Sequence, residues 1–296
     1  MLVVHIGLGK TATTTLQLRI FPKLAAMKKL CFNDPKLLGV IDKFIVSKNQ
    51  KDLRKIKEEL KKRKNVLISY ESLVDWNPVG WRSAAELNLR MFGPGAIILL
   101  TLREPKDYLR SVYQQMIQEG QIIEPERFFI NQQKNQNLKS DKRGKLTKFE
   151  ISAFKLADLV KLYKKKFKKT VVVKMENLQS MNFLENLFLL SEQEKNILKK
   201  IFKDSKKVNQ SFSNSAMKLT FLKEKTFQKY LQNPICLKIK IYLFKLVPLL
   251  QFMSWRWFMQ KIVDRIIPYE KYCFPEQVFD QNPAFKKSVL FYKQLK

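Results

Sequence analysis

The residues best suited to chemistry stand near the amino terminus, in "VVHIGLGKTATTTLQ" (residues 3–17). The stretch begins like a buried strand and ends like the first turn of a helix. A strand–loop–helix unit aims backbone N–H groups and the positive end of the helix dipole at one place, which makes that place an anion site. Lys10 adds a mobile positive charge, and Thr11, Thr13 and Thr14 add hydroxyl donors. The unit therefore predicts a site for a phosphate or a similar anion.

A nucleoside triphosphate is the first ligand to weigh, because Gly9-Lys10-Thr11 matches the end of the Walker A motif. That motif needs another glycine five residues before Gly9, where this chain has Val4. No apolar strand ends in the aspartate that would hold Mg²⁺, since the strand-like run "AIILLTLREP" ends in Arg103 instead. Walker-type hydrolysis is therefore disfavoured, and a nucleotide-dependent kinase with a degenerate loop stays as an alternative.

A second pattern, "LREPKDYLRSVYQQ", begins where that strand ends. Pro105 suits the first turn of a helix, so we expect Ser111 on that helix, close to where Arg103 leaves the strand. A guanidinium fork and a hydroxyl would then converge on one dianionic phosphate. The alternative is an arginine that only caps its own strand–helix junction.

Together these patterns resemble the sulfotransferases that use 3′-phosphoadenosine 5′-phosphosulfate (PAPS). Their first motif is a strand, a Pro-Lys-(Thr/Ser)-Gly-Thr-Thr loop and a helix, here with Gly9 for the usual Pro and Ala12 for the usual Gly. Their second is Arg-(Asp/Glu)-Pro with a serine eight residues after the arginine, here Arg103 and Ser111. The resemblance implies that these two residues hold the 3′-phosphate. It also implies that the 5′-phosphate is cradled by Gly9, Lys10, Thr11, Ala12, Thr13 and Thr14.

Two weaker similarities lie further along the chain. "VVVKMENL" (171–178) resembles the family's late strand with its Tyr-Glu-Asp-Leu-like turn, and "KKVNQSFSNSA" (206–216) resembles an Asn-x-Ser-Leu-Ser segment of some bacterial members. This implies that Asn209 and Ser211 close over the nucleotide, although an Asn-x-Ser pair is equally common as a helix cap. The resemblance covers roughly residues 1–215, and "FDQNPAFKKSVLFYKQ" is similar to a family tail helix.

The implied reaction moves a sulfuryl group from PAPS to an acceptor and leaves 3′,5′-diphosphoadenosine (PAP). It needs in-line positioning, a cation at the leaving group and a base for the acceptor proton, and no metal. Lys10 is our choice for the cation. Glu71 follows an apolar strand, where ligand crevices of open α/β sheets form, and is the first candidate for the base. His5, the only histidine, is the second, against the alternative of a satisfied core residue. The remaining candidates are Asp75, Glu104 and Glu119.

The implied acceptor is a hydroxyl or amine, with a carbohydrate or glycolipid as the leading class. A protein tyrosine, a small phenol and a lipid alcohol remain open. The basic runs "KKRK" (61–64) and "KKKFKK" (164–169) either line a groove for such an acceptor or form solvated faces.

The chain as a whole alternates strand-like and helix-like segments, which predicts an α/β fold. We expect a P-loop-like three-layer fold with a central parallel sheet, helices on both faces and a helical C-terminal extension. The strand-like runs are Leu2–Ile6, Val66–Ser69, Ala96–Leu102 and Thr170–Lys174. The helix-like patterns are Thr13–Met27, Asp52–Arg63, Pro105–Glu119, Ser152–Phe167 and Ser191–Phe202. The predicted core is 1–215, with 120–148 as a long loop and candidate lid, and 216–296 is the extension packed on the same domain.

The formal net charge of +31, from 57 Lys+Arg against 26 Asp+Glu, favours anionic partners unless it only reflects the codon usage of an AT-rich genome. No zinc-finger, recognition-helix or RNP-like signature accompanies it, so we expect no nucleic acid. A basic nucleic-acid- or membrane-binding protein on an inactive α/β scaffold stays as the alternative from another class.

The three cysteines are far apart, with no C-x-x-C pair, and no signal peptide is visible; both features predict a reducing, cytoplasmic location. Charged residues and a proline interrupt the apolar run 239–259. A packed amphipathic helix, a helix on an anionic membrane surface and a true span are the three readings of it. The second would place the protein peripherally at the inner membrane surface through 236–263.

Overall fold

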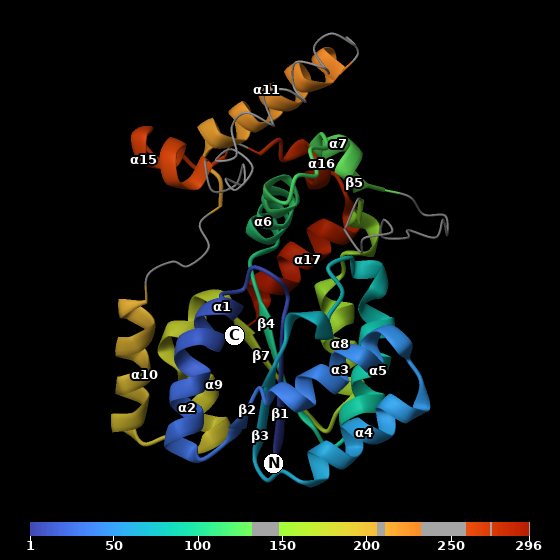
Figure 1. Cartoon of the computed structure of the whole chain (residues 1–296), viewed down its shortest axis with the longest axis vertical. Coiled ribbons are helices and arrows are strands. Elements are labelled where there is room, and N and C mark those ends of the chain that lie inside the picture. Colours follow the sequence, from blue (N-terminus) through green and yellow to red (C-terminus); the bar gives the residue numbers. More distant parts are fainter. Residues whose placement is uncertain (132–147, 206–210, 232–258, 273, 296) are drawn as a thin grey trace, which may run out of the picture. The chain divides into compact units, whose positions relative to one another are not determined.

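The protein has an α/β architecture built on a five-stranded, all-parallel sheet flanked by helices, which confirms the predicted fold class (Figure 1). The computed structural model describes residues 1–131, 148–205, 211–231, 259–272 and 274–295. The sheet order is β2-β3-β1-β4-β7. Its strands are β1 (Leu2–Gly7), β2 (Cys31–Phe32), β3 (Val66–Ser69), β4 (Ile97–Leu102) and β7 (Lys169–Lys174). The four predicted strands are all present, and β2 is an additional strand at the edge.

The chain divides into two compact units. The first comprises Met1–Tyr108, Phe129–Val208 and Phe279–Lys296, and the second comprises Leu109–Phe128 and Asn209–Val278. The carboxyl-terminal helix belongs to the first unit, and most of α6 (Pro105–Gln118) belongs to the second.

The first unit carries the sheet and most of the helices. Figure 1 shows α2, α9 and α10 on one side of the sheet, with α3, α4, α5 and α8 on the other. The helices are α1 (Thr13–Thr15), the π-helix η1 (Leu16–Ile20), α2 (Phe21–Lys28), α3 (Pro35–Ser47), α4 (Gln50–Lys61), η2 (Glu71–Leu73), η3 (Pro78–Gly80), α5 (Trp81–Phe92), η4 (Ile151–Ala153), α8 (Leu156–Lys166), η5 (Met175–Ser180), α9 (Asn182–Phe188), α10 (Glu192–Asp204) and α17 (Pro283–Gln294). The short strands β5 (Phe129–Ile130) and β6 (Phe149–Glu150) pair in parallel.

The second unit is helical in the part that the structure describes. It contains α7 (Pro125–Phe128), α11 (Asn214–Leu231), the π-helix η6 (Met259–Val263) and α15 (Asp264–Ile266). Two helices cross the boundary between the units, α6 (Pro105–Gln118) and α16 (Gln277–Asp280). Of the predicted loop 120–148, residues 132–147 lie outside the described part, and the described portion includes α7 and β5.

Specific polar contacts tie the tail helix α17 to the first unit. The Tyr292 hydroxyl donates to Glu176 Oε2 at 2.6 Å. Ser288 Oγ donates to the Phe154 carbonyl at 2.8 Å and accepts from the Leu156 N–H at 3.1 Å. These bonds satisfy buried groups at the start of α8, so the tail completes the first unit and is not an appendage.

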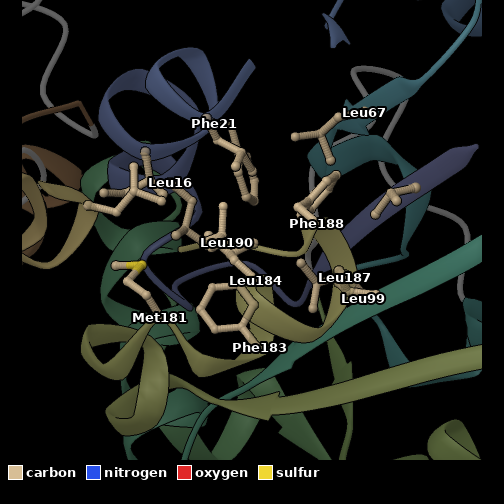
Figure 2. Close-up of a cluster of buried hydrophobic side chains, with 14 of the residues drawn as sticks. Leu16, Phe21, Leu67, Leu99, Met181, Phe183, Leu184, Leu187, Phe188 and Leu190 are labelled. Atoms are coloured by element: carbon tan, nitrogen blue, oxygen red, sulfur yellow. The ribbon is translucent and has the colours of Figure 1, made fainter. Parts of the chain in front are cut away.

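One apolar layer shows how the sheet carries its helices (Figure 2). The strand side chains Val3, Leu67, Leu99 and Val173 point to the same face, because side chains alternate along a strand. The helical side chains packed on them are Leu16, Ile20, Phe21, Leu24, Phe183, Leu184, Leu187, Phe188 and Leu198. Burial of this layer fixes the helical stretch that follows β1, and therefore the loop between them.

Among the described helices, none combines the length and the hydropathy that crossing a membrane requires. Most of the segment 236–263, on which the predicted membrane contact depends, lies outside the described residues, and its described end is η6.

A candidate anion site at the carboxyl edge of the sheet

Three loops leave the sheet side by side, after β3, β1 and β4. The chain passes from β1 to strands on one side and then to β4 on the other, so the strand order reverses at β1. In open α/β sheets a ligand crevice forms outside the carboxyl ends of the strands at such a point. The loop between β1 and α1 lies at this reversal, which places the predicted anion site where the topology favours one.

Along that loop the backbone dihedral φ alternates between negative and positive values. Lys10 has φ of 68° and Ala12 has φ of 58°, whereas Gly9, Thr11 and Thr13 do not have positive φ. Successive residues whose φ values differ in sign turn their N–H groups toward the same concave side. This arrangement, called a nest, is one that binds anions. Lys10 and Ala12 adopt this conformation although both carry side chains, which glycine would not.

The conformation of Ala12 lowers the stability of the protein, because the left-handed region costs a residue with a Cβ about 1–2 kcal/mol. An Ala12→Gly variant is therefore expected to be more stable by about 1 kcal/mol in urea unfolding. Ala26→Gly in α2 is the matched control, because Ala26 is exposed in an ordinary helix and its replacement should lower stability by about 1 kcal/mol. Equal losses in both variants would contradict the assigned backbone conformation.

Gly7 at the end of β1 and Gly9 in the loop are both closely packed. A Cβ on Gly9 would lie 2.1–2.7 Å from ring atoms of Trp76, and a Cβ on Gly7 would lie 2.1 Å from Thr13 Cγ2. The Trp76 indole, which is partly buried, therefore lies directly against the loop. This contact leaves no room for a side chain at position 9.

Arg103 reaches the same loop from the end of β4. Its Nη1 donates a hydrogen bond of 3.1 Å to the carbonyl oxygen of Lys10, and both residues are partly buried. The structure thus brings the Arg103 guanidinium to the backbone of the loop at Lys10.

Two carboxylates lie after β3. Glu71, at the start of η2, accepts a hydrogen bond of 2.7 Å from Thr13 Oγ1, which ties it to the first turn after the loop. Asp75 is solvent-exposed, yet desolvation by the surrounding protein raises its pKa, and it accepts from the Asn77 N–H at 2.8 Å. Both carboxylates follow β3, the strand beside β1, and a positioned carboxylate is a common general base.

The other carboxylates that the sequence left open are engaged in local structure. Glu104 Oε2 accepts from the Asp107 N–H at 2.9 Å, which caps α6. Glu119, which follows α6 in the second unit, accepts from Gln115.

His5 is fully buried, and both of its ring nitrogens contact hydroxyl groups. Nδ1 lies 2.7 Å from Ser69 Oγ, and Nε2 lies 3.2 Å from Thr101 Oγ1. Burial lowers the pKa of His5 to about 3, because the charged imidazolium would lose its hydration without gaining a carboxylate partner among these contacts. The imidazole is therefore neutral at physiological pH.

Thr11, predicted as a phosphate ligand, is also fully buried. Its Oγ1 donates to the Leu8 carbonyl at 2.7 Å and contacts Thr101 Oγ1 at 2.8 Å. Its hydroxyl therefore holds the loop from inside, and a ligand would meet its backbone N–H.

Three residues predicted to bind the nucleotide are not among the described residues of the first unit. Ser111 is buried in the part of α6 that belongs to the second unit, and Ser211 is partly buried in the same unit. Asn209 lies outside the described residues. The predicted convergence of these groups with Arg103 stays a prediction.

Ser69, Thr101 and Trp76 are site residues that sequence reasoning missed. Polar residues lie on one face of three adjacent strands, toward their carboxyl ends, namely His5, Ser69 and Thr101. In strands that are otherwise apolar, that coincidence was a usable signal, but reading it requires the strand order.

No family model, curated protein or solved structure matches this chain. The class that its fold defines is a three-layer α/β protein with an all-parallel sheet, and its function must be argued from the site.

Proposed function

We propose that this protein is a PAPS-dependent sulfotransferase whose donor binds at the loop 8–12. The observation that supports the proposal most directly is the hydrogen bond from Arg103 to the Lys10 carbonyl. It brings the guanidinium of the second motif to the loop of the first, as one nucleotide with two phosphate groups would need. The topological position and the nest conformation of the loop support the same assignment.

In the proposed complex, the N–H groups of the loop and the Thr13 and Thr14 hydroxyls hold the 5′-phosphate, and Arg103 holds the 3′-phosphate. The acceptor oxygen attacks sulfur as the bond between sulfur and the bridging oxygen of the 5′-phosphate breaks, and PAP leaves with that electron pair. Lys10 stabilises the negative charge that grows on the bridging oxygen.

Glu71 is the proposed base. The Thr13 hydroxyl donates to one of its oxygens, which orients the carboxylate at the start of the helix and leaves acceptor capacity for a substrate proton. Asp75 is the competing candidate, because its raised pKa brings it closer to neutrality. His5 is not proposed as the base, because both of its ring nitrogens contact hydroxyl groups and the side chain is fully buried.

A carbohydrate or glycolipid hydroxyl is the proposed acceptor. Trp76 supports this class, because it places a partly buried aromatic ring against the loop, and aromatic walls are a common part of small-molecule sites. The apolar face of a sugar ring could lie on that indole with a hydroxyl directed at the donor.

Nucleotide binding is the direct test. PAP at a hundred times its Kd should stabilise the protein by about 2.7 kcal/mol, seen as a rise of several degrees in Tm. Arg103→Ala should weaken PAP binding by about tenfold or more, because a charge-assisted contact to a dianion is lost. It should also abolish the preference of the site for PAP over 5′-AMP. Arg19→Ala, which removes one positive charge from an exposed position, should leave both ligands unaffected.

The rival functions give different results in the same assay. Stabilisation by ATP and Mg²⁺ but not by PAP would favour the kinase. Absence of nucleotide binding, with salt-sensitive DNA or liposome binding that survives Lys10→Ala and Arg103→Ala, would favour the basic scaffold protein.

A further inference from the structure

A buried row of polar groups runs across the sheet beneath the loop. It passes from Gln17 in η1 through Ser69 of β3, His5 of β1 and Thr101 of β4 to Thr11 in the loop. The strand register produces the row, because His5 pairs with Ser69 and Gly7 pairs with Thr101. The four members after Gln17 are fully buried.

Hydrogen bonds in this row have a direction that its loop end determines. Thr11 donates its single hydroxyl hydrogen to the Leu8 carbonyl, which can only accept. The contact of 2.8 Å between Thr11 and Thr101 then needs the hydrogen of Thr101. With that hydrogen committed, Thr101 can only accept from His5 Nε2 at 3.2 Å.

The same direction continues to the other end. A neutral imidazole with its hydrogen on Nε2 has a bare Nδ1, which accepts from the Ser69 hydroxyl at 2.7 Å. Ser69 Oγ in turn accepts from Gln17 Nε2 at 3.1 Å, and that amide can only donate. Every hydrogen in the row is used once, and both ends agree.

We infer that His5 is a positioning residue, locked as the Nε2-protonated tautomer, that couples the end of β3 to the loop through Thr101 and Thr11. Phe21 packs on the imidazole in a T-shaped arrangement, with ring centroids 5.2 Å apart. The assignment of a hydrogen to each donor in the row does not involve a bound nucleotide. It can therefore be tested independently of the proposed function.

The test uses the full chain labelled with ¹⁵N-histidine, in which the only histidine gives one pair of ring signals. Protonated and bare imidazole nitrogens resonate far apart, so the tautomer is read directly at neutral pH. We expect the hydrogen on Nε2. A hydrogen on Nδ1 would overturn the inference.

Two variants test whether the order is set from the loop. Thr11→Val frees the hydrogen of Thr101 to turn toward Nε2, so the Nδ1-protonated form should gain about tenfold in population relative to the other. Thr101→Val removes the acceptor of Nε2 and should move the hydrogen the same way. Thr15→Val, at a partly buried position in α1, is the control and should leave the tautomer as it is. An unchanged tautomer in both site variants would refute the coupling.

Discussion

A Lys10→Ala variant is expected to lose sulfuryl transfer by about 10²–10³-fold while keeping most of its affinity for PAP. Lys10 is placed in the loop, where it would face the bridging oxygen of the donor, and charge develops on that oxygen only as the bond to sulfur breaks. A cation there stabilises the transition state more than the bound nucleotide. The measurement is release of PAP from PAPS with a panel of carbohydrate acceptors, in EDTA, alongside PAP titration.

The matched control is Lys48→Ala. Lys48 shares the left-handed backbone of Lys10, with φ of 53° against 68°, so both substitutions place alanine in the same conformation and remove one charge. Lys48 is exposed at the end of α3, outside the site, and its loss should leave turnover unchanged. A similar loss in both variants would trace the effect to net charge or folding. A loss of PAP affinity as large as the loss of turnover would make Lys10 a binding group.

The sheet was predictable because its strands are short apolar runs. β3 has the predicted bounds, and β1, β4 and β7 differ from the predictions by one residue at one end. β2 was missed, since two residues carry no periodic signal. Parallel strands buried on both faces read as continuous apolar segments, so their pattern survives without knowledge of their neighbours.

The missed helices lack clear boundaries in the sequence. α5 starts after Gly80, with no side-chain cap, and η3 precedes it. α3 does have a proper cap at Asp34, which accepts from the Leu37 N–H, but Gly39 and several β-branched residues weaken its helical pattern. Such segments become helices through packing, which overrides propensity.

The parts of the candidate site that could be predicted are those formed by residues close together in the sequence. Lys10 and Arg103 were selected as candidates because each stands in a local motif at the end of a strand. The coupling of Thr11 to His5 depends on the register between β1 and β4, which no local pattern encodes. Ser111 belongs to the second unit, and the short motif that singled it out carries no information on that division.

Acidification from pH 7.5 to pH 5 is expected to lower the free energy of unfolding by about 2 kcal/mol through His5 alone. Its pKa is about 3 in the folded protein against an ordinary value of 6.5. The unfolded chain therefore takes up a proton in this window and the folded chain does not. Stability is complete above pH 6.5 and falls as the pH drops toward the folded pKa. Urea unfolding at the two pH values and constant ionic strength measures the difference.

His5→Gln separates this effect from every other titration, because the chain has no second histidine. The variant should be less stable at pH 7.5, since the row of hydrogen bonds is disturbed, but should lack most of the slope between pH 7.5 and pH 5. Carboxylates such as Glu59, whose pKa hydrogen bonds from Lys62 and Arg63 lower to about 2, act only at more acidic pH. A slope that persists in His5→Gln would show that the imidazole titrates alike in both states. The burial that keeps His5 from serving as a base would then not hold.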